Sequence, residues 1–277
     1  MPQIVKVLLI LAGVFIVVVI GFQVHWLLGI GLIAGLLIYL IYANLSTWYV
    51  LRGNAVYAQG DLDKALAFLE KAYKSKNANP QHHIQYAFLL MKVGEQEKAE
   101  KVLQKLLQVA TSTDVRMQAK SNLATAYWLL NRQDEAIRLL EEICQDYKTV
   151  TVVGNLGYFK LLKGDLETAL AFNEEAYEYD DNDLTITDNL AQNYYMLGRL
   201  DEAARMYEKV MAKSPRYADS YYYYAKTLEG LGRNEEAAEQ AGLASERTLA
   251  LVTSITKSEI DQLKDKLATE TDALEKI

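Results

Sequence analysis

The stretch LAQNYYMLGRLDEAARMYEKV, residues 190–210, decides the fold. Apolar and small residues recur at helical spacing on both sides of Gly198, and Ala203 follows that glycine by five positions. A spacing of i, i+3, i+4 and i+7 predicts two amphipathic helices, which a tight turn would join. Gly198 predicts a helix end with positive φ, because glycine adopts that conformation without steric cost.

The same pairing of a turn residue with a later alanine recurs along the chain. The pairs are Gly60/Ala65, Gly94/Ala99, Asn131/Ala136, Gly164/Ala169, Gly198/Ala203 and Gly232/Ala237. Successive turn residues are 34, 37, 33, 34 and 34 positions apart. A period near 34 residues indicates a solenoid of about six helix–turn–helix units. Arrays of this kind present extended surfaces that bind other proteins.

The recurring pattern resembles the tetratricopeptide repeat (TPR) family over about residues 45–250. Two further segments that carry the resemblance are AVYAQGDLDKALAFLEKA (55–72) and LGYFKLLKGDLETALAFNEEA (156–176). The resemblance implies an all-α chain with a right-handed α-solenoid over residues 45–253 and a C-terminal capping helix over residues 254–277. A coiled-coil or partner-binding helix is the alternative for the last segment.

In TPR proteins the first helix of each pair lines a concave groove, and the resemblance places twelve residues of this chain there. They are Asn54, Tyr57, Phe88, Met91, Thr125, Trp128, Tyr158, Leu161, Gln192, Tyr195, Tyr222 and Lys226. The set is mostly aromatic and apolar, which suits an extended peptide or an apolar helix face. Six large side chains are expected to be partly exposed in the free protein: Tyr57, Phe88, Met91, Trp128, Tyr158 and Tyr195. For any single residue, packing between adjacent repeats is the alternative.

One known kind of TPR groove does not fit. TPR domains that clamp a peptide's terminal carboxylate use Lys, Arg and Asn at such positions. Only Asn54 matches here, and Val50 stands where a lysine would be needed. The resemblance therefore does not extend to a clamp for chaperone tails.

Residues 4–51 form an apolar stretch in which Lys6 is the one charged side chain. A single helix of this length would measure roughly 70 Å, against a hydrocarbon core of about 30 Å. Two spans, over residues 4–22 and 27–42, fit instead, and residues 21–26 supply the turn. The sequence therefore predicts two membrane-spanning helices.

The predicted domain over residues 1–44 is a transmembrane helical hairpin, and its second helix is expected to continue through residues 45–58 into the first repeat. A cleaved signal peptide is the alternative for the first span, although a small-x-small cleavage site is not evident. Lys6 and Arg52 flank the hairpin, whereas the turn carries only His25. This bias predicts a multi-pass protein of a bacterial-type cell membrane with a cytoplasmic solenoid. An extracytoplasmic adaptor with reversed topology stays open.

Gly31 and Gly35 form a GxxxG spacing inside the second span. Such glycines permit close helix contact, either with the first span or with another copy of the chain, which would make a homo-oligomer. Glycines merely tolerated in lipid are the alternative.

The charge balance argues against nucleic-acid partners. From Arg52 onward the chain carries 28 Lys and Arg against 36 Asp and Glu, a net charge of −8, since Lys6 is the one basic residue before that point. A negative surface does not provide a nucleic-acid footprint or dock on anionic lipid. Cys144 is alone, so the chain forms no internal disulfide.

No pattern in the chain indicates catalysis. The sequence has no His, Cys, Asp and Glu set with metal-ligand spacing and no glycine-rich phosphate loop. We therefore expect no catalytic residue, no metal and no cofactor. A subunit of a membrane enzyme is the alternative, but Lys6 is the one ionised residue near lipid and it can snorkel. The resemblance implies a membrane-anchored scaffold that binds a protein or peptide, in envelope assembly, quality control or translocation.

Overall fold

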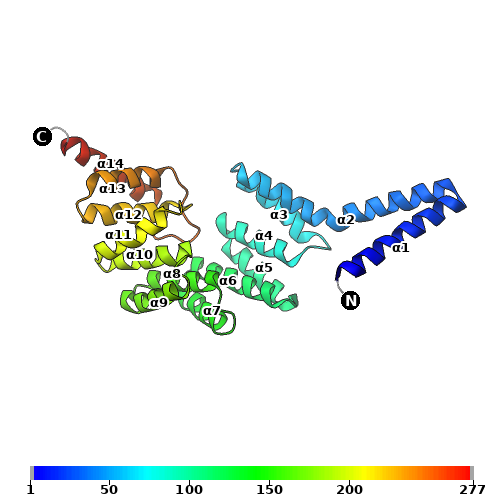
Figure 1. Cartoon of the computed structure of the whole chain (residues 1–277), viewed down its shortest axis with the longest axis horizontal. Coiled ribbons are helices and arrows are strands. Elements are labelled where there is room, and N and C mark those ends of the chain that lie inside the picture. The colour runs from blue at the N-terminus through cyan, green and yellow to red at the C-terminus, as the bar shows by residue number, and fades with distance from the viewer. Residues whose placement is uncertain (1–2, 275–277) are drawn as a thin grey trace. The chain divides into compact units, whose positions relative to one another are not determined.

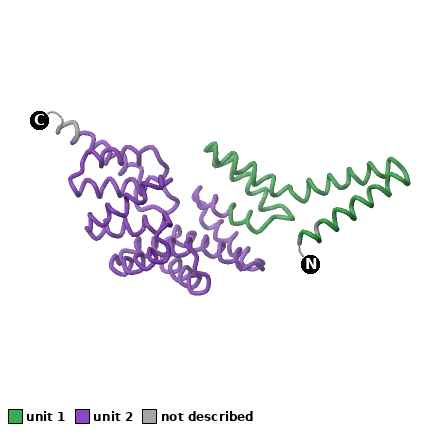
Figure 2. Tube along the Cα trace, in the orientation of Figure 1, with its two compact units in different colours: residues 1–86 green, residues 87–277 purple. Residues whose placement is uncertain are grey.

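The computed structural model describes residues 3–274, and every element within that range is an α-helix. The predicted all-α class is confirmed for this part of the chain. Two compact units make up the structure, residues 1–86 and residues 87–277 (Figure 2).

Unit 1 begins with two helices that fold back on each other, α1 (Gln3–Val24) and α2 (Trp26–Ala58) (Figure 1). The break falls at His25, whose backbone is extended. Its Nδ1 accepts a hydrogen bond from the Leu27 amide at 3.2 Å. The histidine therefore caps α2, where a free amide would otherwise lack an acceptor.

The close approach of α1 and α2 involves Gly21 and Gly29. A Cβ added to Gly29 would overlap the Phe22 ring. By contrast, a Cβ on Gly31 or Gly35 would meet no heavy atom within 4 Å. Two residues turn a helix by about 200°, so Gly31 points away from the face that Gly29 presents to α1. Of the alternatives for the GxxxG pair, contact with the first span is therefore not observed, and contact with another copy stays a proposal.

Both helices are long and apolar enough to cross a membrane, and most of their side chains are exposed. The 33 residues of α2 make a helix of about 50 Å, longer than the hydrocarbon core. Near its C-terminal end Ser46, Val50 and Gly53 are buried. This face packs against α3 (Leu62–Lys74), so one unbroken helix is both the second candidate span and the first repeat helix, as expected.

A buried polar contact fastens the end of α2 to the following helices. The hydroxyl of Ser46 donates to the Ala72 carbonyl at 3.0 Å. Its remaining lone pair then accepts from Nδ1 of His82 at 2.6 Å. Burial lowers the pKa of His82, which favours the neutral ring with its proton on Nδ1. His82 stands near the start of α4 (Pro80–Lys92), whose last residues belong to unit 2.

Ten more helices follow α4 in unit 2, and successive helices from α5 onward pack on each other (Figure 1). They are α5 (Gln96–Val109), α6 (Thr113–Leu129), α7 (Gln133–Asp146), α8 (Val150–Lys163), α9 (Leu166–Tyr179), α10 (Leu184–Met196), α11 (Leu200–Met211), α12 (Ala218–Gly230), α13 (Asn234–Ser245) and α14 (Lys257–Leu274).

The predicted turn residues all have the left-handed backbone that the repeat requires. The five turn glycines have φ between 74° and 99°, and Asn131 has φ of 61°. Asparagine is among the few residues that tolerate this conformation. The six alanines that follow are at most 1% exposed: Ala65, Ala99, Ala136, Ala169, Ala203 and Ala237. The repeat register is therefore confirmed.

The last helix, α14, closes the core of unit 2. Its Ile260, Leu263 and Leu267 are buried in the same cluster as Tyr221 and Tyr224 of α12. An apolar face buried in this way is what a capping helix provides to a solenoid. Residues 275–277 of the predicted cap lie outside the described part of the chain.

Candidate partner-binding cavity

Unit 2 contains a cavity of about 460 Å³ along the first helices of successive repeats. Its walls come from α6, α8, α10 and α12, with Phe88 added from α4. The connection between α13 and α14, residues 246–256, supplies a further wall through residues 250–252. We call this connection the strap. It runs beside α12 in Figure 1.

We call α6, α8, α10 and α12 the inner helices. Polar side chains join these helices across the cavity. Each of three bonds links one inner helix to the next. They are Asn155 Nδ2 to Ser121 Oγ at 3.3 Å, Asn189 Nδ2 to the Gly154 carbonyl at 2.8 Å, and Ser220 Oγ to Asp188 Oδ2 at 2.9 Å. Hydrogen bonds that satisfy buried polar groups fix the relative position of the helices. The cavity is therefore preorganised.

Asp219 of α12 holds the strap. One carboxylate oxygen accepts from the Ala250 amide at 3.0 Å, and the other accepts from the Thr253 hydroxyl. A third contact joins the hydroxyls of Tyr223 and Ser254 at 2.6 Å. An irregular, non-helical segment thus lies against the inner helices, with one amide bonded to an inner carboxylate.

Asp188 is the most perturbed carboxyl group in the cavity. Burial raises its pKa to about 7, the nearby charge of Asp219 adds to this shift, and the bond from Ser220 opposes it. A carboxylate removed from water loses hydration, so its neutral form is favoured. Burial likewise raises the pKa of Tyr158 well above its usual value. The cavity therefore excludes much of the solvent while it retains charge.

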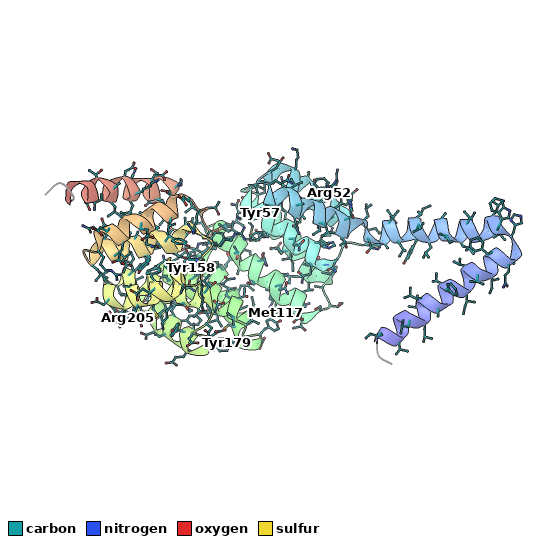
Figure 3. The ribbon with its side chains drawn as sticks, turned by 45° about the horizontal axis from the view of Figure 1, so that its top comes forward. Arg52, Tyr57, Met117, Tyr158, Tyr179 and Arg205 are labelled. Atoms are coloured by element: carbon teal, nitrogen blue, oxygen red, sulfur yellow. The ribbon has the colours of Figure 1, made fainter. Side chains whose placement is uncertain are left out.

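Of the twelve residues predicted for the groove, four line this cavity. They are Phe88, Thr125, Tyr158 and Gln192. Tyr158 extends from α8 (Figure 3) and is partly buried, whereas Phe88 is exposed. Gln192 is 3% exposed, so almost none of its surface is accessible to solvent.

Two of the predicted groove residues are in the core. Met91 is 2% exposed, although partial exposure was expected, and Leu161 is fully buried. Each stands three positions after a residue that lines the cavity, and three positions turn a helix by about 300°. The resulting offset of about 60° turns these side chains away from the cavity.

The other predicted residues lie outside the cavity walls. In unit 1, Asn54 is exposed and Tyr57 is partly buried. In unit 2 the members are partly buried, and their contacts are with neighbouring side chains. Trp128 stacks on Phe159 with centroids 4.3 Å apart, Tyr195 lies 5.5 Å from Tyr223, Tyr222 lies 5.3 Å from Tyr223, and Lys226 pairs with Glu229. These four side chains are therefore packed against neighbouring side chains rather than freely exposed.

Sequence reasoning missed the acidic residues of the cavity and the strap. Asp188 and Asp219 stand in helices whose register was predicted, but neither occupies a position that the repeat pattern marks. Most of the strap is the sequence TLALVTSIT, residues 248–256, which has β-branched residues and no helical spacing. That signal predicts a non-helical segment but not its docking site.

The described residues show no group of three or more His, Cys, Asp or Glu side chains that could hold a metal ion. Cys144 is partly buried, and burial raises the pKa of its thiol. A raised pKa disfavours the thiolate, which is the reactive form of cysteine.

Comparison with family models identifies the repeats. Two models, each described as a tetratricopeptide repeat, match residues 56–119 with 196–248 and residues 116–152. Together they cover more than half of the chain.

Comparison with individual proteins agrees with this assignment. The protein adenylyltransferase Fic of Drosophila willistoni is 29% identical over 127 residues, which are 45% of this chain and 23% of that protein. A TPR repeat-containing protein of Methanocaldococcus jannaschii is 24% identical over 177 residues, 61% of this chain and 31% of that protein. The chain thus spans less than a third of these curated relatives.

A solved structure shows the same fold. A thermophilic TPR protein from Thermus thermophilus superposes with a TM-score of 0.57 at 24% identity, covering 66% of this chain and 99% of that one. At this identity the likeness concerns the fold alone.

Proposed function

Because the chain belongs to the tetratricopeptide repeat family, we propose that it is a membrane-anchored scaffold that binds a partner protein or peptide. The hairpin of α1 and α2 is the anchor, and the inner face of unit 2 is the binding surface. The observation that carries the binding role is the cavity of about 460 Å³. Its volume lies within the range of about 300–1,000 Å³ that is usual for ligand pockets.

The chemistry of the cavity suits an extended segment of protein. Phe88, Phe159 and Val252 offer apolar contact, while Asp188 and Gln192 offer polar atoms to a main chain. Extended peptides bind in this way, with apolar pockets for side chains and hydrogen bonds for the backbone. The strap supports the proposal, because a non-helical segment already bonds to the inner helices through a backbone amide.

The exposed apolar surface of α1 and α2 supports the anchor. Large aliphatic side chains cover both helices and remain exposed. A surface of this kind is unfavourable in water and favourable in lipid. Lys6 and Arg52 then support a cytoplasmic position for the repeats in a bacterial-type cell membrane, and reversed topology is the alternative. Gly31 and Gly35 offer an open face for a second copy.

We propose binding rather than catalysis. The aligned segment accounts for 23% of the length of the adenylyltransferase, so the similarity gives no ground for assigning that protein's activity to this chain. A role in envelope assembly, quality control or translocation is the kind of process that a membrane-bound scaffold of this family serves.

The membrane anchor predicts that the full chain stays in the pellet when host membranes are washed with carbonate at high pH. The double substitution Ile16→Arg with Leu37→Arg should release most of it, because each central arginine costs about 2.5–3.5 kcal/mol on insertion. Immunoblots of pellet and supernatant measure the outcome. Release of the unmodified chain would show that the hairpin does not span the membrane.

The binding surface predicts that Thr151→Trp lowers partner capture at least tenfold. Thr151 is exposed and lines the cavity, so an indole there obstructs the entrance without disturbing the core. The measurement is recovery of a reproducible partner band by tagged full-length chain from solubilised membranes.

Thr168→Trp is the matched control for this experiment. Thr168 is an exposed threonine on α9, which does not line the cavity. The control should capture the partner normally. If Thr168→Trp fails and Thr151→Trp succeeds, the partner uses the outer surface and the cavity assignment is wrong.

A further inference from the structure

Two buried polar atoms in the cavity have no partner among the residues that the structure describes. They are Oδ1 of Asp188 and Nε2 of Gln192. Both residues line the cavity, and both belong to α10. Gln192 is 3% exposed, and Oδ1 of Asp188 is closed to solvent. Buried polar groups are normally hydrogen-bonded, so these two atoms indicate a ligand with matching groups.

The spacing of the two residues defines those groups. Residues four apart on a helix have Cβ atoms about 5–6 Å apart, so one small ligand group bridges both once the two side chains turn toward the cavity. Asp188 Oδ1 needs a hydrogen-bond donor, and Gln192 Nε2 needs an acceptor. The ligand must therefore present a donor and an acceptor close together.

Charge decides which donor fits. Asp188 and Asp219 both line the cavity, and both oxygens of Asp219 are already occupied by the strap. Arg216 at the cavity wall is exposed, and its guanidinium lies 5.5 Å from the Tyr217 ring. A buried carboxylate without a counter-ion is unfavourable, so a cationic donor is preferred and a ligand carboxylate is repelled.

From these observations we infer that the cavity binds the free amino terminus of a peptide, with the α-ammonium on Asp188 and the first carbonyl on Gln192. An aminoacyl terminus supplies a cationic donor and a neutral acceptor that are separated by one carbon atom. A lysine side chain supplies the cation alone and leaves Gln192 without a partner. The inference rests on the proposed function, since it names the part of the partner that enters the cavity.

The strap gives an internal example of the same recognition. Its Ala250 amide donates to Asp219 of α12, and Asp219 lines the cavity together with Asp188 of α10. The inner face thus already bonds the backbone amide of a non-helical segment through a carboxylate. Walls from Leu251 and Val252 leave apolar space for the side chains that follow the terminus.

Binding should depend on pH with a maximum near neutrality. The groups that face Asp188 are Ser220 and Asp219 of α12, Tyr158 of α8 and Tyr207 of α11. The pKa of Asp188 is raised to about 7, so binding of an ammonium strengthens as the pH rises through that value. A peptide amine loses its proton near pH 7.7–8.0, so binding weakens above that range.

The test uses full-length protein in detergent micelles and three peptides with a dye at the C-terminus. The first is Ala-Leu-Ala-Ala with a free amino terminus, the second is its N-acetyl form, and the third is N-acetyl-Ala-Lys-Ala-Ala. Fluorescence polarisation measures each dissociation constant. The free terminus should bind saturably, and acetylation should weaken binding at least tenfold.

Variants assign the two contacts. Asp188→Asn keeps an acceptor for Ser220 but removes the charge, and it should weaken the free terminus at least tenfold and abolish the dependence on pH below 7. Gln192→Leu should weaken it several-fold. Asp201→Asn is the control, because Asp201 is exposed on α11 and does not line the cavity. Thermal melting establishes that the variants are folded.

Equal binding of the free and acetylated peptides would overturn the inference and leave the proposed function standing. Preferential binding of the lysine peptide, unaffected by Gln192→Leu, would also overturn it. Binding of none of the three peptides would have the same consequence. The pair Thr151→Trp and Thr168→Trp still tests the proposed function in each of these cases.

Discussion

Gly157→Ala is expected to lower the free energy of unfolding by about 2–4 kcal/mol, which combines overpacking with a lost buried hydrogen bond. A Cβ at this position of α8 would overlap Oδ1 of Asn173. Asn173 cannot move away freely, because its Nδ2 donates to Oδ1 of Asn193 at 3.0 Å and both side chains are at most 1% exposed. Asn193 in turn donates to the Leu166 carbonyl at 3.0 Å. One methyl group therefore disturbs a bonded set that links α8, α9 and α10.

Gly242→Ala is the matched control for this substitution. Gly242 is also a helical glycine, but a Cβ there would meet no heavy atom within 4 Å. Alanine in a helix interior is favoured over glycine, so this variant should gain about 0.5–1 kcal/mol. Urea unfolding of the full chain in micelles, followed by helical circular dichroism, compares the two midpoints. Equal shifts in both variants would show that the amide set does not constrain α8.

The repeat positions could be predicted because each depends on local geometry. A turn at Gly198 needs positive φ, and a close helix pair needs a residue such as Ala203, so both requirements appear in the sequence every 34 residues or so. The buried amide set around Asn173 could not be predicted in this way, because the partner of a buried amide lies on another helix and no local pattern records that pairing.

The cavity was predicted less well for a related reason. The first helices were assigned correctly, but a difference of about 60° around a helix separates the cavity wall from the core. Met91 and Leu161 fall on the buried side of that division, whereas Phe88 and Tyr158 do not. The repeat period does not predict an angle of this size. Residue type does not predict it either, since methionine and leucine are found both in a core and on the wall of a binding cavity.

The strap shows a further limit. Its residues follow the last repeat, where the period no longer applies. The strap docks through Asp219, a residue 31 positions before Ala250. Such a contact depends on the path of the chain after α13 rather than on any helical pattern. Sequence analysis placed the end of the solenoid at residue 253, whereas the last repeat helix ends at Ser245. It did not predict that the following segment returns to the inner face.

Asp219→Ala is expected to free the strap and to raise amide hydrogen exchange in residues 248–254 at least about a hundredfold, since the loss of two hydrogen bonds to a charged group amounts to at least about 3 kcal/mol. The substitution removes the acceptor for the Ala250 amide and for the Thr253 hydroxyl. Hydrogen bonds to a charged group contribute about 1.5–3 kcal/mol each. The free energy of local opening includes every contact that breaks when the strap detaches, so the two losses add. Exchange followed by mass spectrometry resolves the strap from its neighbours, α13 and α14.

Two controls determine what the exchange result means. Asp201→Ala removes an exposed carboxylate from α11 and should leave exchange in the strap unchanged. Asp219→Asn keeps one acceptor and should give an intermediate rate. Protection that survives in Asp219→Ala would mean that other contacts hold the strap instead. These are the apolar contacts of Leu249 and Val252, the Tyr223–Ser254 contact and the bond from the Ala218 amide to the Thr248 carbonyl. In that case the strap is a fixed wall of the cavity rather than a segment tied by a single carboxylate, and a partner would have to fit the space as it stands.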